Sequence, residues 1–205
     1  MIEIQDLQEL QLDALREVAS IGAGHAATAL SQMTASRIMI SVPRLQIARL
    51  EEIPELIGTA DAVVATVLMH VLGDVTGRTL LVLPENAAQR LSERLLRRAT
   101  GTVKEFREVE QSALKETGNI LCAAYLNALS DFMGLMLLLS VPILVIDQCG
   151  AVLTSAYIEF AQAQDFVFSI ETQFTLGEGD PVAGHFLLLP DLPSLQVILK
   201  SIRLA

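Results

Sequence analysis

Two short lines of polar side chains recur in this sequence at one spacing. They are Asp13, Glu17 and Ser20, and Ser112, Glu116 and Asn119. Steps of four and then three positions place the members of each line on one face of an α-helix. A carboxylate there can pair with a cation, and a carboxamide can both accept a hydrogen bond from a water molecule and donate one to it. The same pattern is also the ordinary polar face of an amphipathic surface helix, so the spacing alone leaves both interpretations open.

A duplication favours the functional interpretation. When the chain is shifted by 99 positions, residues 13–47 align without a gap with residues 112–146, and twelve of the 35 pairs are identical. In both copies a proline follows the third member of the line after 22 intervening residues, at Pro43 and at Pro142. A repeated polar line at a fixed distance from a repeated proline indicates that one ancestral unit was copied.

The repeated pattern, Asp/Ser-x3-Glu-x2-Asn-x22-Pro, lies within the segments ALREVASIGAGHAATALSQM and ALKETGNILCAAYLNALSDFMG. It resembles the CheC family of chemotaxis phosphatases, which is related to CheX and to the phosphatase part of FliY. The resemblance covers nearly the whole chain. It implies a protein phosphatase that hydrolyses the aspartyl phosphate of the response regulator CheY, and the receptor deamidase CheD as an expected further partner.

The resemblance also implies roles for the second line. Asn119 would position the attacking water in the active site of the receiver, and Glu116 would anchor the helix by pairing with a receiver cation. Ser112 would extend the contact line, and Pro142 would fix a strand edge or bend. No cofactor or metal is expected on this chain, because the receiver itself supplies the Mg²⁺ beside its aspartyl phosphate.

The first line departs from the family pattern at one position. Asp13, Glu17 and Pro43 match, but Ser20 stands where the family has asparagine. A hydroxyl is shorter and rotates freely, and the loss of one oriented group commonly costs about 10²–10³ in rate. We therefore expect a degenerate first site that docks a receiver through Asp13 and Glu17. The sequence leaves open an alternative function, a non-catalytic adaptor that binds a receiver or CheD.

The elements that must position these lines follow the same twofold plan. Each half reads as a helix (8–34 and 107–134), a strand (36–48 and 136–147), a strand (62–73 and either 151–160 or 165–176), a strand (77–83 and 183–189) and a helix (85–99 and 191–203). Turn signals at 73–74 and 177–181 predict hairpins. Halves of this size would each have a marginal core. We expect an α/β fold of the α+β type: a single CheC-like domain of two intertwined pseudo-symmetric repeats, about 8–99 and 107–203, with a mainly antiparallel sheet packed against long helices.

Composition excludes several classes of protein. Of 205 residues, 52% are hydrophobic, which excludes a disordered chain. The net charge of −10 argues against nucleic acid and anionic lipid as partners. The start lacks a basic signal region, and the apolar run 133–146 is shorter than the ~20 residues of a membrane span. We therefore expect a cytoplasmic protein, and a monomer, because the duplication already supplies two faces.

Other reactive residue types carry less weight. His25, His70 and His185 lack the spacing of metal ligands. Cys122 and Cys149 form no disulfide framework, and Cys122 is expected to be a buried structural thiol. The glycines of Gly22-Ala-Gly24 favour close helix packing over phosphate binding. The arginines at 90, 94, 97 and 98 are interpreted as a solvated, paired surface.

Overall fold

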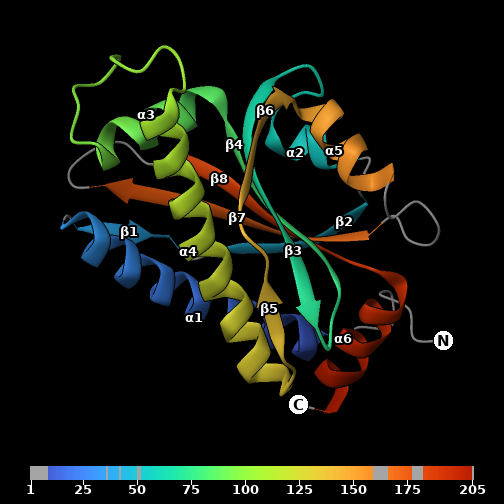
Figure 1. Ribbon diagram of the computed structural model, residues 1–205. Helices are drawn as coiled ribbons and strands as arrows, with labels where there is room; N and C mark the ends of the chain where they lie inside the picture. Colours follow the sequence, from blue (N-terminus) through green and yellow to red (C-terminus); the bar gives the residue numbers. More distant parts are fainter. Residues whose placement is uncertain are drawn as a thin grey trace.

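The computed structural model describes residues 9–35, 37–41, 43–49, 52–158, 166–176 and 182–204 (Figure 1). The first half contains α1 (Glu9–Thr34), β1 (Ile38–Ile40), β2 (Arg44–Arg49), α2 (Ile53–Ile57), β3 (Val63–Gly73), β4 (Gly77–Pro84) and α3 (Glu85–Leu95). The second half contains α4 (Glu108–Met133), β5 (Leu137–Leu139), β6 (Ile143–Gln148), α5 (Cys149–Ile158), β7 (Phe166–Leu176), β8 (Val182–Pro190) and α6 (Leu192–Leu204). Within the described residues, the two halves therefore present the same seven elements in the same order.

The strands exchange partners between the halves. β1 and β2 of the first half pair with β7 of the second, and β5 and β6 of the second half pair with β3 of the first. The registers correspond, since Leu45 lies opposite Ile170 and Leu144 lies opposite Val67. β4 pairs with β8 and joins the two hairpins into one antiparallel sheet. The expected intertwined repeats and antiparallel sheet are confirmed.

Both faces of this sheet are covered. The long helices α1 and α4 pack on one face together with α3 and α6, and the short helices α2 and α5 pack on the other (Figure 1). The position of β4 explains its apolar run LLVL at 80–83: Leu81 and Leu83 contribute to the core under the long helices, whereas Leu80 and Val82 contribute to the core under the short ones. A strand buried on both faces reads as a continuous hydrophobic run.

The helices α1 and α4 cross at a glycine. A Cβ atom on Gly22 would lie 2.8 Å from Cδ1 of Tyr125 and 3.0 Å from its Cα, so only glycine permits this approach. Close helix packing is thus confirmed for Gly22, whereas Gly24 has open space around it. The end of α1 lies beside the start of α4, and Leu15 near the start of α1 lies beside Met133 at the end of α4. The two helices therefore run antiparallel.

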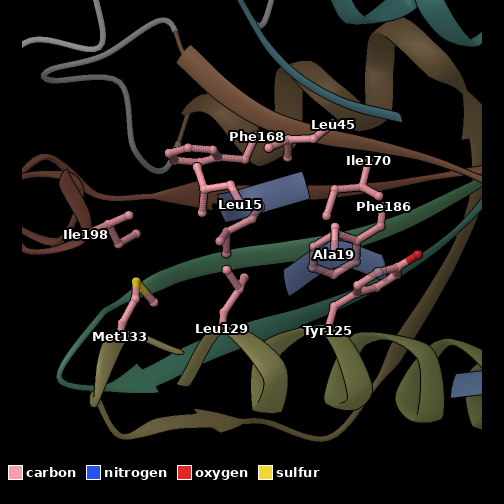
Figure 2. A pocket seen from close by; sticks show the side chains of 11 residues that line it. Leu15, Ala19, Leu45, Tyr125, Leu129, Met133, Phe168, Ile170, Phe186 and Ile198 are labelled. Carbon is pink, nitrogen blue, oxygen red and sulfur yellow. The ribbon is translucent and has the colours of Figure 1, made fainter. Parts of the chain in front are cut away.

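A small apolar cavity of about 20 Å³ lies under this crossing (Figure 2). Leu15 and Ala19 reach it from α1, and Tyr125 and Leu129 reach it from α4. The ring of Tyr125 lies beside that of Phe186, with centroids 4.9 Å apart, and its hydroxyl shares a 2.9 Å hydrogen bond with Thr172. Because the exposed lining of the cavity is apolar, it is a packing gap rather than a ligand site.

Several predicted elements differ from the structure. The expected strands 36–48 and 136–147 are each divided, at 41–43 and 140–142. A proline lacks the N–H that a continuous ladder needs, and Ser140 bridges the second break by donating its N–H to His70 O (3.0 Å) and accepting from His70 N–H through Oγ (2.9 Å). The predicted Pro142 role, fixing a strand bend, agrees with this division.

The segment 149–158 is helix α5, so the possible strand at 151–160 is wrong and the alternative at 165–176 is the strand β7. The helix expected at 85–99 ends at Leu95, and α2 was not predicted. The turn at 73–74 joins β3 to β4, whereas the turn at 177–181 lies outside the described residues. In the part of the chain that the structure describes, no helix is both long and apolar enough to cross a membrane.

Candidate functional site

The second polar line is positioned by a helix whose start is fixed. The N–H of Arg107 donates to Oε2 of Glu110 (3.0 Å), which satisfies a donor at the first turn of α4. Glu110 is 2% exposed and also pairs with Arg98. A hydrogen bond from its own backbone N–H, with those from Arg98 and Arg107, holds its pKa below the usual range against the opposite effect of burial. A second buried carboxylate, Glu93, accepts from the N–H of Val103 at 2.8 Å. The segment that joins the two halves is therefore tied to α3 through Glu93 and to the start of α4 through Glu110.

The face of α4 that carries the line points away from the core. Ser112 and Glu116 are exposed and Asn119 is half-buried, whereas Leu114 and Gly118 on the opposite face are buried. Among the residues that the structure describes, the side chains of Glu116 and Asn119 have no hydrogen-bond or ion-pair partner. The carboxylate and the carboxamide are thus available to a second molecule.

The buried face of α4 sits directly on the sheet. A Cβ atom on Gly118 would lie 2.6 Å from Cγ1 of Val67 on β3, so the backbone beside Asn119 approaches the strand as closely as glycine allows. This contact sets the height of Asn119 above the sheet. The corresponding position of α1 is Ala19, beside the cavity described above.

The first polar line is engaged within its own helix. Asp13 forms an ion pair with Arg16 at 2.5 Å, and Ser20 donates its hydroxyl hydrogen to the carbonyl oxygen of Arg16 at 3.0 Å. Glu17 is exposed. The donor of Ser20 is therefore used by the helix backbone, as is common for serine within helices.

The two lines lie at opposite ends of the helix pair. Glu17 precedes Gly22 by five residues, and Glu116 precedes Tyr125 by nine. Because the helices cross antiparallel at these two residues, a rise of 1.5 Å per residue separates the two glutamates by roughly 20 Å. The structure brings the three members of each line onto one helix face and keeps the two lines apart.

Other reactive groups lie in the core. Cys122 is fully buried, and burial raises the pKa of its thiol to about 12, so it is a structural thiol and not a nucleophile. His185 is 8% exposed, and burial lowers its pKa. Within the described ranges, no three His, Cys, Asp or Glu side chains come together as metal ligands.

A groove lies beside the second line, and it was not predicted from the sequence. Ser112 and Glu116 line it together with the ends of α1 and α3. Its other residues include Met33 and Arg97, which lie far from the motif in the sequence. Only the packing of three helix ends brings them together, so no local signal could have found them.

The fold and the repeated line define a class of duplicated α+β proteins in which two crossed helices each carry a polar motif. The CheC-like family matches residues 10–47 and 109–146, the segments that hold both lines. The chain is 32% identical over 199 residues to the CheY-P phosphatase CheC of Bacillus subtilis (strain 168), covering 96% of this chain and 95% of that relative. This chain belongs to the CheC-like family.

More distant proteins share part of the sequence or the fold. The putative CheY-P phosphatase CheC1 of Halobacterium salinarum is 23% identical over 71% of each chain. The structure of FliY from Thermotoga maritima matches with a TM-score of 0.73 at 17% identity, over 97% of this chain and 98% of that one. The FliM middle domain from H. pylori matches with a TM-score of 0.67 at 13% identity, over 95% and 99%. At these identities the two structures share the fold.

Proposed function

We propose that this chain is a phosphatase that removes the phosphoryl group from the aspartate of a CheY-type receiver, and that Glu116 and Asn119 form its competent site. The observation that carries the proposal is that, within the described residues, the Glu116 carboxylate and the Asn119 carboxamide have no partner on the open face of α4. The 32% identity to a CheY-P phosphatase over nearly the full chain supports the same reaction.

In this proposal the face of α4 enters the active site of the receiver. Asn119 holds a water molecule in line with the phosphorus, because its carboxamide can accept from the water and donate to it at once. Glu116, about one turn earlier, pairs with a cation of the receiver and fixes the position of the helix. The Mg²⁺ belongs to the receiver, so this chain contributes only positioning groups.

The first site has a lesser role in this proposal. Ser20 offers no carboxamide, and its hydroxyl hydrogen is bonded to Arg16 O. Asp13 and Glu17 remain on an exposed face and dock a receiver without turning it over. We further propose that the protein acts as a monomer in the cytoplasm, where its two free, buried thiols stay reduced.

The substitution Asn119→Ala tests the proposal. It removes the water-positioning group, and we expect phosphate release from phosphorylated CheY to fall by about 10²–10³, to the decay rate of the receiver alone. Binding of the receiver should change by less than about twofold, because the anchoring Glu116 remains. Asn127→Ala is the matched control, since Asn127 is an exposed asparagine two turns further along α4.

The alternative is a non-catalytic adaptor that binds a receiver or CheD through the same helices. It requires that the unchanged protein release no phosphate above the receiver's own decay. An equal loss of hydrolysis and of binding in Asn119→Ala would also contradict the role proposed for Asn119.

A further inference from the structure

The groove beside the second polar line is built from three helix ends. It measures about 540 Å³ and lies between the last turn of α1, the end of α3 and the first turns of α4. Its lining includes the apolar residues Met33, Leu95, Leu96 and Val109 and the polar residues Ser112 and Glu116. Two of them, Ser112 and Glu116, are members of the polar line, so the groove and the proposed site are one continuous surface.

The groove exposes apolar side chains to water. Met33 is 44% exposed and Val109 is 53% exposed, and Leu95 and Leu96 lie half-buried between them and the core. Apolar side chains lining a concave surface next to charged groups are typical of a place where a partner inserts an apolar side chain.

The shape of the groove is held by hydrogen bonds. Arg97, in a left-handed backbone conformation (φ 54°), donates from its guanidinium to the carbonyl oxygen of Thr34 at 2.9 Å. The end of α1 is thereby fastened to the end of α3. The start of α4 is fixed by Glu110 and Arg98, as described above. The groove is therefore formed before any partner arrives, which lowers the entropy cost of binding.

The two halves of the chain differ at this surface. The positions that correspond to Met33 and Thr34 are Phe132 and Met133, and both pack against the core. The position that corresponds to Ser112 is Asp13, which is paired with Arg16. The exposed apolar residue Met33 thus lies in the groove beside the second polar line, whereas its counterpart near the first polar line, Phe132, packs against the core.

We propose that this groove receives an apolar side chain of the phosphorylated receiver, next to its phosphorylated aspartate, and so sets which receivers the site accepts. The inference rests on the proposed function. A stable interface buries about 800 Å² per partner, a patch of roughly 16 Å radius. If it is centred on Asn119, it reaches Glu116 after about 4.5 Å and Val109 after about 15 Å of helix rise. A receiver seated on Asn119 covers the groove.

Two substitutions test the groove without weakening its helices. Met33→Lys places a cation near the end of α1, and Val109→Glu places an anion in the first turn of α4, and each charge agrees with the helix dipole. Each puts a charge where the receiver's apolar side chain must sit. We expect the KM for phosphorylated CheY to rise about tenfold in each variant and kcat to stay within about twofold. Leu56→Lys is the matched control, because Leu56 is 40% exposed on α2, across the sheet from α4.

The outcomes separate this inference from the function on which it rests. If the KM is unchanged in both groove variants while Asn119→Ala still abolishes hydrolysis, the proposed binding role of the groove is wrong and the proposed phosphatase activity is retained. If the unchanged protein proves inactive, binding is measured instead with a receiver that carries beryllofluoride on its aspartate. Equal binding by the unchanged protein and by Met33→Lys, or no binding at all, then overturns the groove. A dimer in sedimentation that Met33→Lys dissociates would assign the groove to a second copy and also overturn the inference.

Discussion

At the residue scale, one substitution separates the two polar lines. The carboxamide of Asn119 has no partner among the described residues, whereas the hydroxyl of Ser20 donates a hydrogen bond to Arg16 O. A hydroxyl whose hydrogen is bonded to the helix can accept a hydrogen bond from a water molecule but cannot also donate one to it, so it orients that water less well than a carboxamide does. We therefore expect the residue type at this position, and not the helix that carries it, to limit the activity of the proposed first site.

Because Ser20 lacks a carboxamide, an asparagine at position 20 is expected to restore activity to a variant that has lost Asn119. In the Asn119→Ala background, Ser20→Asn restores a water-positioning carboxamide beside Glu17, and we expect phosphate release from phosphorylated CheY to rise about tenfold or more above that background. Ser20→Ala in the same background is the control and should restore nothing. A double variant that binds the receiver but hydrolyses no faster than Asn119→Ala would refute the assignment of the first site as a degenerate copy.

The sequence predicted the members of both lines because helical spacing is a local property. It could not predict the ion pair of Asp13 with Arg16 or the hydrogen bond of Ser20, since several rotamers compete at exposed positions. The groove could not be predicted from the sequence either, because Met33 and Val109 come together only when the helices pack.

At the element scale, the packing of α4 against β3 sets the position of the second polar line. The space at Gly118 is filled by the side chain of Val67, which would lie 2.6–2.9 Å from an added Cβ atom. Any side chain at 118 must lift α4 from the sheet, and Asn119 moves with it.

We therefore expect Gly118→Ala to destabilise the protein by about 1–3 kcal/mol and to lower phosphate release, with the stability read from urea unfolding. Gly24→Ala is the matched control, because Gly24 lies within α1 with nothing near it. It should raise stability by about 0.5–1 kcal/mol through helix propensity. Similar free energies of unfolding for the two variants would show that the contact with Val67 does not constrain α4.

The elements themselves were predictable where their patterns are long. The helices α1 and α4 and the hairpin β3–β4 agree with the periodicity and turn signals. Helix α5 was not predicted from the sequence, because CGAVLTSAYI is a short apolar run that fits a buried strand and a buried helix equally well. Likewise α2 is only five residues long, too short to show a period.

At the scale of the whole molecule, neither half completes its own sheet. The strands β1 and β2 find their partner in β7, and β5 and β6 find theirs in β3. The chain connects the halves through exposed residues around Gly101, which has space around it and a φ of +81°. We infer that the halves form one cooperative unit.

Division of the chain after Gly101 tests this unit. We expect the segment 1–101 alone to remain without a cooperative unfolding transition, because a half of about 100 residues has a marginal core and here lacks its cross-strand partners. Produced together, 1–101 and 102–205 should co-purify and show the circular dichroism of the intact chain. A monomeric half that unfolds cooperatively by itself would contradict the inference.

The exchange of strands also bears on how the two copies can diverge over evolutionary time. Asn119 of the second half lies on helix α4, which packs against Val67 of the first half. Under the proposed function, a lineage that loses activity at the first site still cannot discard the first copy, because the helix that carries Asn119 packs on β3 of that copy. On the same basis we expect any selection that keeps Asn119 to extend to Val67, whereas a change at Ser20 leaves the contact between α4 and β3 intact.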